Sequence, residues 1–377
     1  MRVKYIAKRL AAIAVFAYIL LVTVLLLSAD VIPNYMVSIQ TRLQGLQRGL
    51  QRGLQSTSDL VAPLPSCVTC CYRYIHCLKS TECGNNTFVK ADLPDDEFKK
   101  RQCMRRLPGA IIIGTKKSGT SALQKFLGFH PEIAAADGEP HFFNRPVYHY
   151  GETFYKKMMP LSSKQQVTLE KTPIYYAYYP LGVHRRVHRL LPHAKLIIIL
   201  RDPIKRAISD YFMETRYLLA SGGKLSPKRL EPLHGYDLGD TFEKSVLTAS
   251  GGKVNPQSKF VSLSVYNYSL SHWLSVFPRS SLLAIDGDAF VKDPLPALKE
   301  TERFLGVQSF FDEDSFFTEE NRGFRCLAKP VRTCWKSVKR PPHPTIPEDV
   351  LQKLKKFYEP YNRSLVKLLN QTFEWAK

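Results

Sequence analysis

Acidic residues are scarce in this chain. Its 377 residues hold 33 Asp and Glu against 54 Lys and Arg, which gives a net charge of +21. This balance suits a polyanionic partner, which can be a nucleic acid, an anionic lipid or an acidic polysaccharide. The histidines form no HExxH motif, so the sequence indicates no metal site. The hydrophobic content of 44% is enough for one substantial globular domain.

A lysine is missing where a nucleotide-binding loop would carry it. Residues 111–120 predict a buried strand that runs into a phosphate-cradling turn, and residues 121–127 have the spacing of a helix with one buried face. A Walker A loop places its lysine directly after its last glycine, whereas Lys116 and Lys117 stand before Gly119. The pattern argues against an ordinary P-loop ATPase and favours a loop that holds a 5′-phosphosulfate.

Residues 10–29 form a run of twenty residues without a charge, which spans about 30 Å as a helix and matches a bilayer core. Four basic residues precede the run and Asp30 follows it. The positive-inside rule therefore predicts that residues 1–9 are a cytosolic tail and that the rest of the chain lies across the membrane. A cleaved signal peptide is the alternative, but the apolar core is long and no clear small-x-small cleavage site follows it.

Cysteines and glycosylation sequons agree with a lumenal body, which makes nucleic acid an unsuitable partner. Six of the eight cysteines fall within residues 67–103, where disulfides are expected in the lumen and zinc ligation in the cytosol. Residues 30–106, which include a tandem LQRG repeat at 46–53, are interpreted as a lumenal Cys-rich stem. The sequons are at Asn85, Asn267, Asn362 and Asn370.

Residues 107–377 alternate apolar strands with amphipathic helices, which predicts an α/β fold with a P-loop-NTPase-like parallel sheet flanked by helices. Residues 195–200 are the clearest buried strand after the first, and residues 281–285 are expected to form another. Arg201 then stands at the carboxyl end of a strand, and Ser209 lies two turns into the following helix. Both side chains are expected to converge on one phosphate at the edge of the sheet.

Six segments together carry a family resemblance. They are GTKKSGTSAL at 114–123, HPEIAAADGEPHFF at 130–143, EKTPIYY at 170–176, LRDPIKRAISDY at 200–211, DGDAFVKDPLPALKETERFL at 286–305 and GFRCL at 323–327. With them the chain resembles the PAPS-dependent Golgi sulfotransferases, and among these the heparan sulfate glucosamine 3-O-sulfotransferases. The likeness covers nearly all of residues 107–377, although N-deacetylase/N-sulfotransferases and some chondroitin sulfotransferases share several of the motifs.

The resemblance implies PAPS (3′-phosphoadenosine-5′-phosphosulfate) as the sulfate donor, without a metal. Lys117, Ser118, Gly119, Thr120 and Ser121 would hold its 5′-phosphosulfate, and Arg201 and Ser209 its 3′-phosphate. Arg201 has an alternative role as an ion-pair partner of Asp202. Further donor contacts are expected from Arg325, Lys339, Arg340 and His343, and a disulfide is expected between Cys326 and Cys334. The family's Lys-Gly-Arg run is not intact here, because Lys339 is followed directly by Arg340.

On the acceptor side the resemblance implies Glu139 as the general base, with His141 beside it and Lys171 near both donor and acceptor. Lys117 would stabilise charge on the leaving phosphate. Substrate contacts are expected from Glu139, His141, Lys171, Thr172 and Pro173. Two residues depart from the family pattern, because Asn144 and Met213 stand where relatives carry aspartate and glutamine. Basic residues suited to a sulfated polysaccharide groove are Arg185, Arg186, Arg189, Lys253 and Lys259.

The expected protein is thus a single-pass type II enzyme of the Golgi membrane with a lumenal catalytic domain. It would transfer a sulfuryl group from PAPS to the 3-hydroxyl of glucosamine in heparan sulfate. The alternatives are N-sulfation of heparan, 6-O-sulfation of chondroitin N-acetylgalactosamine, a P-loop kinase in which Asp202 binds the metal, and a catalytically inactive heparin-binding membrane protein.

Overall fold

The computed structural model describes residues 70–76, 88–92, 94–221, 238–250, 252–318, 325–330, 332, 334 and 345–376. All of them belong to one compact unit, Leu64–Lys377. Several predictions lie outside the described residues, namely the cytosolic tail, the membrane anchor at 10–29, the tandem repeat, Asn85, Lys339, Arg340 and His343. Within the described ranges, none of the helices has the length and apolar character needed to span a bilayer.

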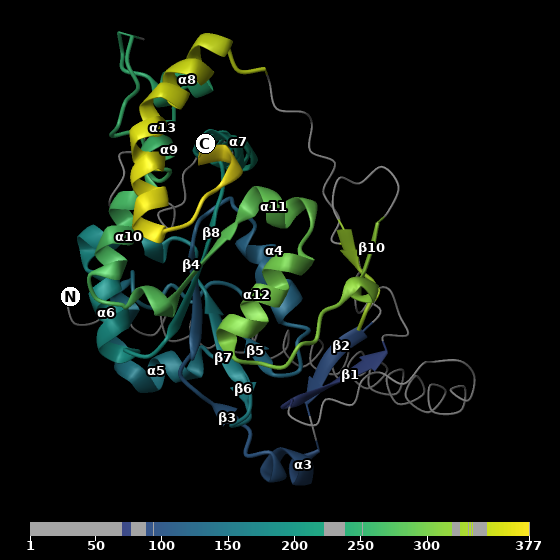
Figure 1. Ribbon diagram of the computed structural model, residues 1–377. Coiled ribbons are helices and arrows are strands. Elements are labelled where there is room, and N and C mark those ends of the chain that lie inside the picture. The colour runs from purple at the N-terminus through teal and green to yellow at the C-terminus, as the bar shows by residue number, and fades with distance from the viewer. Residues whose placement is uncertain are drawn as a thin grey trace, which may run out of the picture. The chain divides into compact units, whose positions relative to one another are not determined.

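A parallel sheet of five strands, in the order β5-β7-β4-β8-β9, forms the centre of the molecule (Figure 1). Every neighbouring pair in it is parallel. The predicted sheet is therefore confirmed. The strands are β4 (Ala110–Gly114), β5 (Ile133–Ala135), β7 (Val167–Lys171), β8 (Lys195–Leu200) and β9 (Leu282–Asp286).

Helices cover both faces of this sheet, as Figure 1 shows. Successive side chains of β4 point to opposite faces, so Ile111 and Ile113 enter one apolar core while Ala110 and Ile112 enter the other. The first core takes side chains from α6 (Val183–Leu190), α10 (Tyr266–Leu274) and α13 (Glu348–Leu369). The second takes them from α4 (Thr120–Leu127), α11 (Gly287–Lys292) and α12 (Leu295–Leu305).

A third apolar core lies beyond the sheet, where α7 (Pro203–Ala220) packs with α8 (Phe242–Val246), α9 (Lys259–Ser262) and α13. The remaining elements are short. They are β1 (Tyr72–His76), β2 (Phe88–Asp92), α3 (Asp95–Lys100), β3 (Met104–Arg105), α5 (Gly151–Lys157), β6 (Leu161–Ser162), β10 (Phe316–Thr318) and β11 (Arg325–Leu327).

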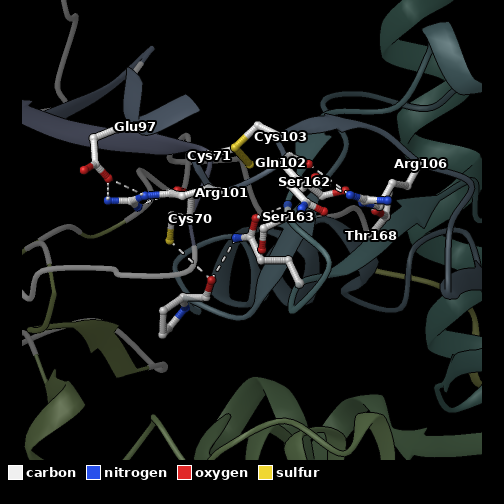
Figure 2. Close-up of a disulfide and its surroundings, with 12 residues drawn as sticks. Cys70, Cys71, Glu97, Arg101, Gln102, Cys103, Arg106, Ser162, Ser163 and Thr168 are labelled. Atoms are coloured by element: carbon white, nitrogen blue, oxygen red, sulfur yellow. Dashed lines mark hydrogen bonds and ion pairs between the residues drawn. A yellow bond between two sulfur atoms is a disulfide. The ribbon is translucent and has the colours of Figure 1, made fainter. Parts of the chain in front are cut away.

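The end of the Cys-rich segment is fastened to the sheet domain (Figure 2). A disulfide joins Cys71 to Cys103, and Cys70 is disulfide-bonded as well. Arg101 Nη1 donates to the carbonyl of Cys70 at 2.7 Å, and Arg106 Nε donates to the carbonyl of Ser162 at 3.2 Å. Strand β3 also pairs with β6. The disulfide and Arg101 thus hold residues 70–71 to residues 94–106, while Arg106 and the pairing of β3 with β6 hold residues 94–106 to the sheet domain.

One glycine sets how closely α11 approaches the loop after β4. A Cβ atom at Gly287 would lie 2.8 Å from the carbonyl oxygen of Ser118 and 3.0 Å from that of Leu200. Both are backbone atoms, so the main chain itself would have to shift to make room. We expect Gly287→Ala to lower the free energy of unfolding by about 1 to 3 kcal/mol, since overpacking costs this much. Urea unfolding measures the loss. Gly252→Ala is the control, because a Cβ there meets nothing within 4 Å, and equal stability of the two variants would contradict the prediction.

Candidate active site

The loop between β4 and α4 is wound tightly by two residues with positive φ. Lys117 has φ 77° and Gly119 has φ 107°, a conformation that glycine adopts without steric cost. The Thr115 hydroxyl fixes the base of the loop, since Thr115 Oγ1 lies 2.6 Å from Ser118 Oγ and 3.0 Å from the carbonyl oxygen of Ile199. Gly119 caps α4 without a side chain, so the first N–H groups of that helix are suited to hold an anion.

A cavity of about 580 Å³ opens in front of this loop. The carboxyl ends of β4, β7 and β8 meet at this edge of the sheet, which is where open α/β sheets bind ligands. The structure brings ten of the predicted site residues into its lining. They are Lys117, Ser118, Gly119, Thr120, Ser121, Glu139, His141, Pro173, Arg201 and Ser209.

A carboxylate and two basic groups form the centre of the site. Lys171 Nζ lies 2.9 Å from Glu139 Oε1 and donates to Ser121 Oγ at 3.2 Å, so one ammonium group joins Glu139 to the loop after β4. His141 Nε2 lies 3.4 Å from Glu139 Oε2. Burial alone would raise the pKa of Glu139, but the hydrogen bonds and charges of His141 and Lys171 outweigh it and lower that pKa to about 2. Glu139 is therefore a carboxylate at neutral pH.

A second carboxyl group, which is fully buried, supports this centre. Glu170 accepts hydrogen bonds from Tyr155 and from Thr172 Oγ1, the latter at 2.8 Å. Burial raises the pKa of Glu170, and these hydrogen bonds oppose the rise. Thr172 Oγ1 in turn accepts from the backbone N–H of His141 at 3.3 Å, where the chain takes a positive φ of 53°. Thr172 is itself buried, so the structure places it behind His141 and not in the cavity lining.

Arg201 and Asp202 have separate roles at the end of β8. Arg201 lines the cavity, and its guanidinium contacts Asp288 Oδ1 at 3.4 Å and the carbonyl of Lys117 at 3.4 Å. Asp202 instead caps α7, because its Oδ1 accepts from the N–H groups of Ile204 and Lys205 at 2.8 and 3.2 Å. The cap accounts for this aspartate without an ion pair to Arg201.

A buried charge cluster beside the cavity was not predicted from the sequence. Lys116 Nζ lies 3.2 Å from Asp210 Oδ1 and 2.8 Å from Glu214 Oε1. Asp210 also pairs with the fully buried Arg206 at 3.0 Å, and Glu214 with Lys259 at 3.7 Å. The acidic and basic residues of α7 recur at every fourth position, 206, 210 and 214, and this spacing was the available signal. The prediction that Lys259 faces a polysaccharide groove is wrong, because Lys259 is buried in this cluster.

The charges of this cluster set the titration of its carboxyls. Burial alone would raise the pKa of Asp210, but Lys116 and Arg206 outweigh it and lower that pKa to about 2. Burial would likewise raise the pKa of Glu214, but Lys116, and to a smaller extent Lys259, lower it below its ordinary value. Both carboxyl groups are therefore ionised at neutral pH, and the lysine that precedes Lys117 in the loop is held by α7.

Other predicted residues lie away from the cavity. Arg325 forms ion pairs with Asp293 at 3.1 Å and Glu313 at 2.8 Å and does not line the cavity in the described part of the chain. Cys326 and Cys334 are joined by a disulfide. Asn267 and Asn362 are half-buried on helices, while Asn370 is exposed at the end of α13, and glycosylation of all three stays a prediction.

Comparisons with known proteins agree with this geometry. Residues 107–361 match the model of the sulfotransferase domain, so the chain belongs to the sulfotransferase family and is a sulfotransferase enzyme. The crystal structure of a sulfotransferase from Alicyclobacillus acidocaldarius has the same fold, with a TM-score of 0.50 and 20% identity over 72% of this chain and 100% of that one.

Within that family the chain groups with the heparan sulfate glucosamine 3-O-sulfotransferases. It is 35% identical over 276 residues to human heparan sulfate glucosamine 3-O-sulfotransferase 6, and the aligned region covers 72% of this chain and 75% of that protein. It is 33% identical over 291 residues to the human 3-O-sulfotransferase 5, covering 76% and 80%. The resemblance drawn from the sequence motifs is confirmed.

Replacing Asp210 should uncover the role of the buried cluster. We expect Asp210→Asn to lower the free energy of unfolding by about 3 to 5 kcal/mol, because it leaves buried cations without their counter-charge. Denaturant unfolding at neutral pH measures the change. Asp240→Asn is the control, since that side chain is 89% exposed and its ion pair with Lys244 should contribute less than about 1 kcal/mol. A cost below 1 kcal/mol at position 210 would show that the cluster is not stabilising.

Proposed function

We propose that this sulfotransferase transfers a sulfuryl group from PAPS to the 3-hydroxyl of glucosamine residues in heparan sulfate. The observation that carries the proposal is the contact of Lys171 with both Glu139 and Ser121, which sets a carboxylate next to the anion-binding loop. The relatives at 33 to 35% identity are named for this reaction on this polysaccharide. The net charge of +21 suits an acidic acceptor.

The residues on the donor side fit PAPS. The amino end of α4 and the ammonium of Lys117 suit the 5′-phosphosulfate, while the forked donors of Arg201 and the hydroxyl of Ser209 suit the 3′-phosphate. PAPS, when bound, supplies the sulfuryl group and a phosphate leaving group. Lys117 stabilises the charge that develops on that phosphate as the bond to sulfur breaks.

Glu139 is assigned as the general base on the acceptor side. One carboxylate oxygen takes the proton from the attacking hydroxyl while a new oxygen–sulfur bond forms and the bond from sulfur to the phosphate oxygen breaks. A carboxylate with a pKa of about 2 is always ready in its basic form but holds a proton weakly. Lys171 reaches both Glu139 and Ser121, so a shift of this ammonium toward the transferring group would strengthen the base as the proton arrives.

We further propose that the enzyme is anchored in the Golgi membrane by residues 10–29 with the catalytic domain in the lumen. The uncharged run, the basic residues before it and the sequons support this placement. The disulfides Cys71–Cys103 and Cys326–Cys334 support an oxidising compartment.

Removing the negative charge of Glu139 should abolish transfer while leaving donor binding intact. We expect Glu139→Gln to lower kcat by about 10²-fold or more, with unchanged calorimetric affinity for PAP, because general base catalysis contributes on this scale. The assay follows labelled sulfate from PAPS into heparan sulfate. Glu152→Gln is the control, since Glu152 is an exposed residue of α5 paired only with Lys156 among the contacts of the described chain. Near-normal turnover in Glu139→Gln would remove the proposed base.

Disaccharide analysis of the labelled product tests the acceptor. Label on the 3-hydroxyl of glucosamine is expected. Label on the amino group of glucosamine, or on the 6-hydroxyl of N-acetylgalactosamine in a chondroitin acceptor, would overturn the acceptor assignment and leave the donor site standing.

The titration of Glu139 should depend on Lys171. In the wild type the carboxyl is expected to stay ionised as the pH falls to about 4, since its pKa is lowered to about 2. Lys171→Met leaves His141 in place but removes the second group that lowers this pKa, so the midpoint should rise toward the ordinary value of 4.5. Carbon-13 NMR of the side-chain carboxyls measures the midpoint in the wild type and in Lys171→Met, and Glu139→Gln serves to assign the signal. A wild-type midpoint near 4.5 would show that the ion pair does not hold in solution.

A further inference from the structure

Charge is divided unevenly between two parts of the chain. Residues 141–200, which include α5 and α6, hold nine Lys and Arg and two Glu, whereas residues 286–318, which include α11 and α12, hold eight Asp and Glu and three Lys and Arg. Helix α6 packs in the core on one face of the sheet and α11 and α12 pack in the core on the other, as Figure 1 shows. The first of these two parts of the chain is therefore basic and the second acidic.

The basic side has an exposed face of arginines on α6. Val183 and Val187 are buried against the sheet, while Arg185 and Arg189 are exposed. These two arginines are four residues apart, so they stand on one side of the helix about 6 Å apart along its axis. In the part of the chain that the structure describes, neither forms an ion pair with a carboxylate.

The acidic residues of the same segment leave this face positive. Glu170 is fully buried under the active site, and Glu152 is paired with Lys156 at 2.6 Å. Neither of them therefore neutralises the arginines of α6.

Arg186 connects this face to the cavity. Its Nη1 donates to the carbonyl of Phe143 at 2.9 Å, and its guanidinium lies 5.1 Å from the centre of the Tyr148 ring. The backbone N–H of Tyr148 donates to the carbonyl of Arg145 at 3.1 Å, and Arg145 lines the cavity. Arg186 of α6 is thus linked, through residues 143–148, to Arg145 in the cavity lining.

We propose that the exposed arginine face of α6 is a docking track for the acceptor chain beyond the sugar that is sulfated. The inference rests on the proposed function and adds the side on which the acceptor chain leaves the cavity. A polysaccharide longer than the cavity must leave it on one side. Toward residues 286–318 its sulfates and carboxylates would meet a part of the chain with eight Asp and Glu against three Lys and Arg, whereas toward α6 they meet guanidinium groups, whose forked N–H donors match both anions.

The track should act on long chains only. In Arg185→Ala/Arg189→Ala we expect KM for long heparan sulfate to rise by about tenfold, since two exposed ion pairs are lost, and its dependence on salt to become weaker. For a short oligosaccharide that occupies only the cavity, KM should be the same as in the wild type. Calorimetric affinity for PAP and the thermal unfolding temperature check that the variant is folded.

Lys355→Ala/Lys356→Ala is the matched control, because it removes two exposed charges from α13 and should leave both KM values unchanged. An unchanged KM for long chains in the arginine variant would overturn the track, and so would an equal rise for short and long acceptors. These outcomes are distinct from failure of the proposed function, in which the wild-type enzyme would transfer no sulfate to either heparan acceptor.

Discussion

The buried pair of Arg206 and Asp210 is the constraint on which much of the site depends. Arg206 is fully buried and donates to Asp210, to the hydroxyl of Ser264 and to the carbonyl of Phe260. Asp210 then reaches Lys116 of the loop after β4. Three parts of the chain far apart in sequence are thereby held together, because an ion left unpaired in the interior would be costly. The position of α7, and with it that of Ser209, follows from this pair.

A second set of polar contacts joins the donor and acceptor halves of the site. Three consecutive residues, the last two of β7 and the one that follows it, have different roles. Glu170 is buried and accepts hydrogen bonds, Lys171 bridges Glu139 and Ser121, and Thr172 holds the backbone of His141. Because these residues are consecutive in the chain, a shift of any of them would move the others. The base, its cation and the anion-binding loop are therefore positioned as one unit.

Net charge alone would suggest that any surface of this molecule can attract a polyanion. The chain divides that charge unevenly, since residues 286–318 hold eight Asp and Glu against three Lys and Arg, while α6 holds three arginines and no acidic residue. Lys259 shows why the sequence is a poor guide here, because it is buried against Glu214 and offers nothing to an acceptor. Only residues that are both exposed and without a carboxylate partner can contribute to the capture of a sulfated chain.

The sequence by itself determined the parallel sheet and the family. Buried runs such as residues 195–200 and the turn around Gly119 are local signals, whose hydrophobic period and glycine geometry depend on neighbours in the chain. Ten site residues were placed by their motifs and do line the cavity. Tertiary structure decided which partner each charge meets. Lys116 and Lys117 are adjacent, yet only packing against α7 turns the first toward Asp210 and Glu214. Ion pairs form between residues that folding brings within about 4 Å, and no local pattern encodes that distance.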